Sequence, residues 1–104
     1  MAKTKLSSVK ISTTLPVFIF REDDAFVAYT PWLDLSTAGG TFEEANSNLS
    51  EAVRLFLEET DAMGTLPTVL RGLGWKESNG KFSAPIMIGH GTESVSYPLA
   101  HACA

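Results

Sequence analysis

Acidic side chains in the first half of the chain are the residues whose chemistry could be catalytic. Asp23 and Asp24 are adjacent, Asp34 falls at an expected strand end close to a glycine pair, and Glu43 and Glu44 follow that pair. Several carboxylates that converge on one point can hold two divalent metal ions and so support phosphodiester cleavage. The sequence therefore raises the question whether these side chains form a metal-dependent ribonuclease site.

Each of these carboxylates also has a structural interpretation. Thr41 and Glu44 have the spacing of a capping box, in which a hydroxyl and a carboxylate each accept a free N–H at the start of a helix. Asp23 and Asp24 suit a tight turn, and Asp34 could bond nearby backbone N–H groups in an Asx-type turn. Because these roles need no metal, we expect no catalytic residues and predict that the protein is not an enzyme.

Histidine and cysteine are too few to indicate a metal centre. His90 lies between two glycines, and His101 and Cys103 are two residues apart near the end of the sequence. Two ligands without a second pair are a weak basis for a zinc site, so we expect no metal and no cofactor. A single cysteine cannot form an internal disulfide, which fits a reducing compartment and leads us to expect a cytoplasmic protein.

The composition indicates one folded, acidic domain over residues 1–104. Hydrophobic residues make up 44% of the chain and the formal net charge is −4, which suits a basic partner better than a nucleic acid backbone. No apolar run approaches the roughly 20 residues that span a membrane. No apolar stretch follows the charged N-terminal residues, so we expect no secretion signal.

The first forty residues have the pattern of β-strands. Residues 6–21 alternate between apolar and other side chains, which predicts a strand that Pro16 interrupts or places at an edge. Residues 26–35 predict a second strand, which Pro31 ends or kinks, and the short turn between them predicts an antiparallel hairpin. Residues 36–38 predict a short third strand.

The remainder predicts two helices and further extended segments. Between Thr41 and Gly64, apolar residues at helical spacing define one face that we expect to be core; they are Phe42, Ala45, Leu49, Ala52, Val53, Phe56 and Leu57. Residues 65–75 predict a short second helix. Asn79-Gly80 predicts a tight turn, and residues 93–99 predict a final strand.

This order of elements predicts the α+β class. We expect a small antiparallel sheet of about three or four strands packed on one long helix, with a short second helix beside it. Residues 14–75 form the expected core module, and residues 76–104 add a C-terminal hairpin or strand and a tail.

Several segments together resemble the HicB-like antitoxins of bacteria and archaea. The similarity covers most of residues 15–99, and its parts are FREDDAFVAYTP at 20–31, a glycine with Thr41, FEEANSNLSEAVRLFLEE at 42–59, GTL at 64–66, LGW at 73–75 and SYPL at 96–99. The chain departs from the commonest family pattern at WLDLSTAGG, residues 32–40, where many members have a Pro-Gly pair and a small residue.

The resemblance implies a partial RNase H-like fold that binds and blocks a small basic, RNA-cleaving toxin and that self-associates. Full antitoxins usually carry a separate DNA-binding domain. About thirty strand-like residues with few basic side chains follow Leu73, which leaves no room for a helix-turn-helix, so we expect no direct DNA binding. The alternative is a stand-alone homo-oligomeric regulator or scaffold without a toxin.

Two surfaces are predicted to bind other chains. Tyr29, Trp32 and Asp34 combine aromatic anchors with an acidic group, as partner-binding surfaces do, although Trp32 could instead simply cover the edge of the sheet. The last predicted strand could pair across a dimer by strand addition, with Val95, Tyr97 and Leu99 on one face.

Overall fold

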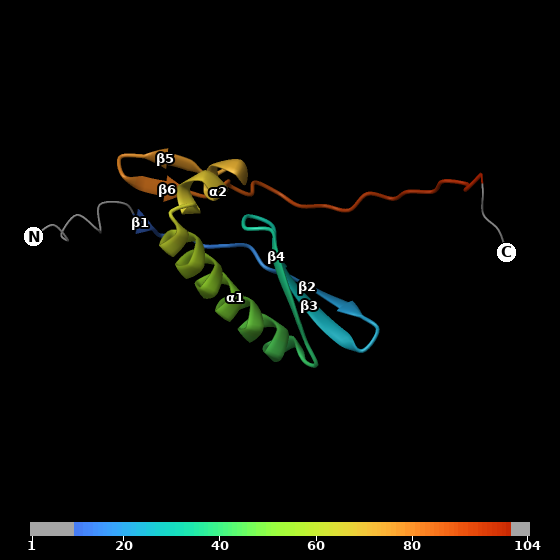
Figure 1. Ribbon diagram of the computed structural model, residues 1–104. Helices are drawn as coiled ribbons and strands as arrows, with labels where there is room; N and C mark the ends of the chain where they lie inside the picture. The colour runs from blue at the N-terminus through green and yellow to red at the C-terminus, as the bar shows by residue number, and fades with distance from the viewer. Residues whose placement is uncertain (1–9, 101–104) are drawn as a thin grey trace, which may run out of the picture.

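The computed structural model describes residues 10–100 and has the α+β architecture that the sequence predicts (Figure 1). The elements are β1 (Lys10–Ile11), β2 (Phe18–Glu22), β3 (Ala25–Thr30), β4 (Leu35–Gly39), α1 (Phe42–Met63), α2 (Leu66–Gly72), β5 (Lys76–Ser78) and β6 (Lys81–Ser83). The predicted strand residues 6–9, and His101 and Cys103, lie outside the described residues.

Strands β2, β3 and β4 form an antiparallel three-stranded sheet. Phe18 pairs with Tyr29 across the first hairpin and Tyr29 pairs with Ser36 across the second. Asp23 has a φ of 55° in the turn between β2 and β3, a left-handed conformation that aspartate tolerates better than most residues. The hairpin predicted from the short polar segment is therefore confirmed.

The long first strand is divided at the proline that the sequence singled out. Residues 12–17 belong to no strand and separate β1 from β2, as expected where Pro16 cannot donate a backbone hydrogen bond. β1 pairs in parallel with β6, with Ile11 opposite Phe82, and β6 pairs with β5 through the predicted Asn79-Gly80 turn. One extended segment of the chain thus joins the two sheets.

The predicted second strand is too long at its C-terminal end. β3 ends at Thr30, and residues 31–34 form a turn closed by a hydrogen bond of 3.2 Å from the Asp34 N–H to the Pro31 carbonyl oxygen. Asp34 has a φ of 54°, which reverses the chain so that β4 can pair with β3. Of the two roles given to Pro31, the end of the strand is confirmed, so the strand predicted for residues 26–35 does not continue past Thr30.

The start of α1 answers the question raised by the glutamate pair. The Thr41 hydroxyl accepts the Glu44 N–H at 3.0 Å, and the Glu44 carboxylate accepts the Gly40 N–H at 2.6 Å. The predicted capping box is confirmed, with the carboxylate bonding one residue before the cap. Gly64 ends the helix with a φ of 77°. Glu44 therefore has a structural role.

Replacing Thr41 with alanine should lower the free energy of unfolding by about 1 kcal/mol, because a helix N–H loses its acceptor. Thr41→Ser is the matched control, since its hydroxyl can accept the same N–H and should change stability by only a few tenths of a kcal/mol. Urea unfolding followed by circular dichroism measures both variants. Equal losses would show that the hydroxyl does not cap α1.

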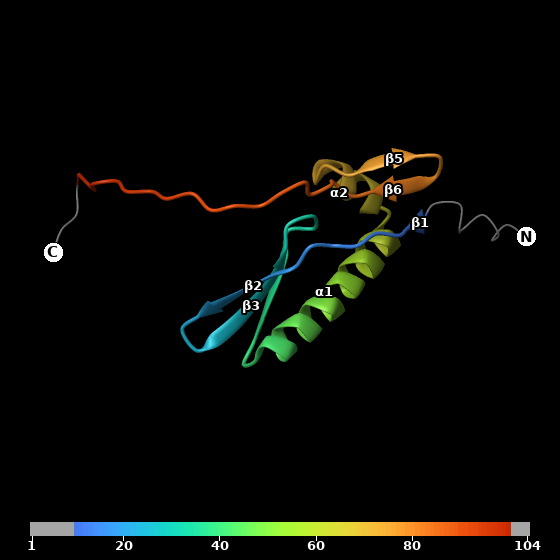
Figure 2. The same cartoon turned by 180° about the vertical axis from the view of Figure 1, so that it is seen from behind.

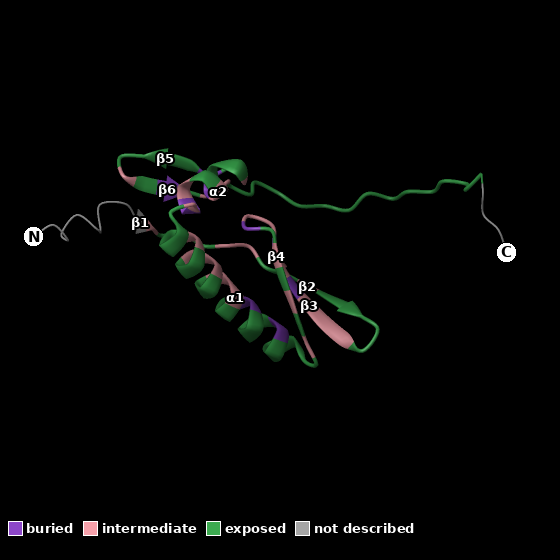
Figure 3. Ribbon diagram, in the orientation of Figure 1, coloured by how far each residue is buried: buried purple, intermediate pink, exposed green. Residues whose placement is uncertain are grey.

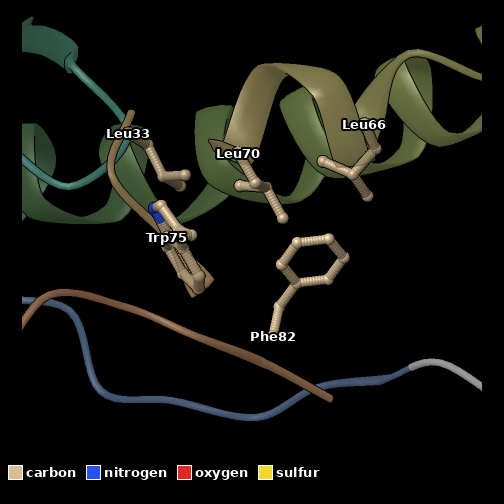
Figure 4. Close-up of a cluster of buried hydrophobic side chains, with 5 residues drawn as sticks. All are labelled: Leu33, Leu66, Leu70, Trp75 and Phe82. Carbon is tan, nitrogen blue, oxygen red and sulfur yellow. The ribbon is translucent and has the colours of Figure 1, made fainter. Parts of the chain in front are cut away.

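Two clusters of buried residues hold the helices to the strands, and Figure 3 marks the buried positions along the ribbon. Ala28, Ala45 and Leu49 join β3 to the first half of α1. The second cluster joins the β3–β4 turn, α2 and the β5–β6 hairpin (Figure 4), and its members are Leu33, Leu66, Leu70, Trp75 and Phe82. The apolar face of α1 thus contributes to the core as predicted, except at Phe42, which is 49% exposed and for which the prediction is wrong.

Residues 84–100 leave the folded body as an extended segment that belongs to no sheet (Figures 1 and 2). The predicted final strand at 93–99 is therefore wrong for the single chain, because no strand within residues 10–100 lies beside it to supply hydrogen bonds. The radius of gyration is 18.2 Å, against about 13 Å for a compact domain of this length. The apolar side chains of the C-terminal segment, Val95, Tyr97 and Leu99, remain exposed.

Candidate partner-binding site

Tyr29 and Asp34 meet at one end of the three-stranded sheet. The turn at residues 31–34 brings the end of β3 next to the start of β4, so these two side chains become neighbours. The Tyr29 hydroxyl donates a hydrogen bond of 3.0 Å to the Asp34 carboxylate. The structure therefore brings together two of the three residues that the sequence predicted for partner binding.

The charge of Asp34 influences its aromatic neighbour. The hydrogen bond to Asp34 is the main cause that raises the pKa of Tyr29 above its ordinary value, and desolvation and the negative charge act in the same direction. Tyr29 thus remains a neutral hydrogen-bond donor near pH 7, while Asp34 stays exposed to solvent. The pair thus presents a carboxylate that is held by a hydrogen bond from Tyr29.

Trp32 lies in the same turn and covers part of the core, which is one of the two roles considered for it. Its side chain is partly exposed and packs against the cluster that contains Leu33 and Trp75. Its carbonyl oxygen accepts a 2.8 Å hydrogen bond from the indole N–H of Trp75, which fixes the turn to the core. Trp32 also lines a groove of about 530 Å³ between residues 12–16 and residues 81–87. It can therefore cover the core and contact another molecule.

An apolar sheet face adjoins this site. Side chains directly opposite one another share a face, so Phe18 lies on the same face as Tyr29, and Phe20 lies on the same face as Val27. The helix α1 packs against the other face, through Ala28. Phe18 is 38% exposed and Phe20 is 50% exposed. The sequence prediction missed both residues, although the continuous apolar run at 17–20 indicated that each face carries apolar groups.

The remaining carboxylates do not join Asp34. Asp23 and Asp24 lie in the β2–β3 turn, and Glu43 and Glu44 follow Gly39, which pairs with Phe26 at that same end of the sheet. Asp34 lies at the opposite end of β3 from Gly39 and Gly40. The expectation that Asp34 lies close to the glycine pair is therefore wrong in the folded chain. Within residues 10–100, no three His, Cys, Asp or Glu side chains gather closely enough to hold a metal ion.

Two of the exposed arginines are already neutralised by neighbouring glutamates. Arg54 contacts Glu51 at 2.7 Å and Glu58 at 2.9 Å along α1, and the hydrogen bond to Glu58 is the main cause that raises the pKa of Arg54. Arg71 contacts Glu77 at 2.9 Å. These ion pairs offset the positive charge of both arginines at the surface. The chain as a whole keeps its formal net charge of −4.

The fold and the site together define a small acidic α+β domain with an aromatic–carboxylate cluster beside an open apolar sheet face. Comparisons of the chain with models of known families, with curated proteins and with solved structures found no match. In the part of the chain that the structure describes, no helix is both long and apolar enough to cross a membrane.

Proposed function

We propose that the chain is a non-enzymatic, HicB-like protein-interaction module of the cytoplasm that binds a small basic partner, an RNA-cleaving toxin. The resemblance in sequence suggests this class. Its expected order of three strands followed by a long helix is consistent with β2, β3, β4 and α1, which supports the proposal, although the expected later strand at 96–99 is not formed in the single chain. The proposal includes self-association and no direct contact with DNA.

The observation that carries the proposal is the cluster of Tyr29, Trp32 and Asp34. Aromatic side chains that are already packed lose little conformational freedom on binding, and they often supply most of an interface's affinity. A carboxylate at the same place attracts a basic partner and helps to set its orientation. Phe18 and Phe20 extend the apolar part of this surface.

The direct test is capture of bound proteins by the tagged full-length chain from its native cells, followed by light scattering of the complex. A small basic protein at fixed stoichiometry, whose cleavage of RNA stops when the chain is added, would establish the proposal. A captured set that contains no such protein, at a chain concentration that saturates the resin, would reject it.

Asp34→Asn should weaken binding of the captured partner by about tenfold, which corresponds to about 1.4 kcal/mol. The change removes the charge, while the amide oxygen can still accept the Tyr29 hydroxyl and asparagine tolerates the positive φ. Asp24→Asn, at the opposite end of β3, is the matched control and should leave the affinity unchanged. Titration of each variant with the captured partner, at low and at high salt, measures the two affinities. Equal effects of the two changes on the affinity would contradict a specific role for Asp34.

A second candidate function is a stand-alone homo-oligomeric regulator or scaffold without a toxin. The observation that favours it is the extended C-terminal segment, in which Val95, Tyr97 and Leu99 are 82%, 76% and 71% exposed. Apolar side chains arranged in this way usually pack against another surface.

A further inference from the structure

We propose that two copies of the chain exchange their C-terminal segments, so that residues 93–97 of one copy pair as an antiparallel strand with the free edge of β2 in the other. This goes beyond the proposed binding of a basic partner and does not depend on it. It gives the physical basis of the self-association that both candidate functions include, while the binding of a basic partner does not rest on it.

The donor segment has the properties of a strand that lacks a sheet. Val95, Tyr97 and Leu99 alternate with Ser94, Ser96 and Pro98, and residues 84–100 contain one formal charge, that of Glu93. Pro98 has no N–H to donate, so a hydrogen-bonded strand is expected to end near Tyr97. The usable strand therefore covers residues 93–97.

The acceptor is the outer edge of β2. This strand is five residues long and pairs with β3 on one side, while on its other side no strand of residues 10–100 bonds to it. An open edge presents unpaired N–H and C=O groups that can hold an added strand. Its length matches that of the donor segment.

Charge selects the direction and register of the pairing. In an antiparallel arrangement with Glu93 opposite Arg21, Val95 falls opposite Ile19 and Tyr97 opposite Val17, the residue just before β2. Opposite charges facing each other across strands are favourable, and within the described residues Arg21 has no ion-pair partner. A shift of one residue would instead bring Glu93 opposite Glu22.

The same register places Tyr97 at a groove that suits a tyrosine. This groove, of about 400 Å³, lies between residues 13–17 and α1; Val17, Thr30, Asn46, Leu49 and Ser50 are among its lining residues. The Thr30 hydroxyl is buried and has no hydrogen-bond partner among the described residues. An aromatic ring with a polar tip fits a lining of apolar groups, hydroxyls and an amide.

The register of β6 shows why the edge must belong to a second copy. β6 runs parallel to β1 with Phe82 opposite Ile11, so the chain after β6 advances in the same direction as residues 12–22. If the chain continued along that register, Glu93 would be level with Glu22, the last residue of β2 in the same copy. Residues 94–97 would then lie beyond the end of β2 and could not pair with it. The residues level with β2 would include Gly89 and Gly91, which disfavour strands.

Reciprocal exchange closes the assembly. If each copy gives its segment to the other around a two-fold axis, both donors and both edges are used, and no further copy can join through these surfaces. The expected product is a dimer. The face that carries Tyr29 stays open, because the added strand occupies the edge of the sheet.

Light scattering of the full-length chain tests the exchange. One chain is 11.2 kDa, and we expect twice this mass at micromolar concentration. A variant that stops after Thr92 should have the mass of one chain and a circular dichroism spectrum that retains the helices. A monomeric full-length chain, or a folded truncated variant that is still dimeric, would overturn the proposal.

Cysteine cross-linking tests the register. In a Cys103→Ala background, an equal mixture of Arg21→Cys and Glu93→Cys chains should form a disulfide between chains, because directly opposed residues meet the distance requirement. The control mixture replaces Glu93→Cys with Ser96→Cys and should yield at least tenfold less product. Equal yields would reject this register. A captured basic protein together with a monomeric chain would reject the exchange and self-association, and would leave the proposed binding of a basic partner standing.

Discussion

Phe82→Ala is expected to lower the free energy of unfolding by about 3–5 kcal/mol, a large part of the about 5–15 kcal/mol that stabilises a typical domain. Phe82 is 2% exposed and lies against Leu66, Leu70 and Trp75 (Figure 4). Removing the ring leaves a cavity that α2 and the β5–β6 hairpin could fill only by moving closer together, and such a collapse is usually incomplete. We expect this to be the most destabilising single change that we propose.

The consequence extends beyond β6, because Phe82 pairs with Ile11 and so connects the hairpin to β1. Arg71 also lies over the ring, 5.7 Å from its centre. Phe42→Ala is the matched control, since Phe42 is 49% exposed and its loss should cost about 1 kcal/mol or less. Urea unfolding followed by tryptophan fluorescence measures both variants. Similar losses would show that the Phe82 cluster is not the main core.

The two proposed interactions use different parts of one sheet. The proposed exchange of C-terminal segments would occupy the outer edge of β2 and the groove beside α1, whereas the proposed basic partner would contact Tyr29, Trp32 and Asp34 at the end of β3. Because α1 covers only one face, the face with Phe18 and Phe20 stays available in the dimer. A dimer of this kind would bind two partner molecules, one on each copy of the chain.

Local sequence signals predicted the local structure well. Thr41 and Glu44 cap α1 as predicted, Gly64 ends it, and Asn79-Gly80 turns β5 into β6 with φ values of 53° and 74°. In each case the residue type itself determines the backbone conformation or the hydrogen bond. Such features depend on neighbours within a few residues, which a sequence displays directly.

Features that depend on distant neighbours were predicted less well. The alternation at 93–99 indicates a strand, yet a strand needs a partner, and within residues 10–100 none lies beside it. The three-residue site was predicted from residue types, but the hydrogen bond from Tyr29 to Asp34 depends on a turn that the prediction assigned to a strand. The separation of Asp34 from Glu44 likewise follows from strand register, which residue spacing alone does not set.

Gly39→Ala is expected to destabilise the protein by about 1–3 kcal/mol, as typical for an added group in a filled space. A Cβ at this position would lie 2.6 Å from the Ala45 nitrogen and 2.9 Å from the Glu44 carbonyl carbon. These are backbone atoms of the first turn of α1, so no side-chain rotation can relieve the contact. The helix start must shift, which would disturb the bond of 2.9 Å from the Thr37 hydroxyl to the Ala45 carbonyl oxygen.

Gly72→Ala provides the matched control for this change. Gly72 is the last residue of α2, and a Cβ there would meet nothing within 4 Å. Because alanine is favoured over glycine in helices by up to about 1 kcal/mol, this variant should be as stable as the original chain or slightly more stable. Urea unfolding of both variants measures the difference. If Gly39→Ala proved as stable as Gly72→Ala, the close approach of β4 to the start of α1 would be wrong, and with it the position of the capping box relative to the sheet.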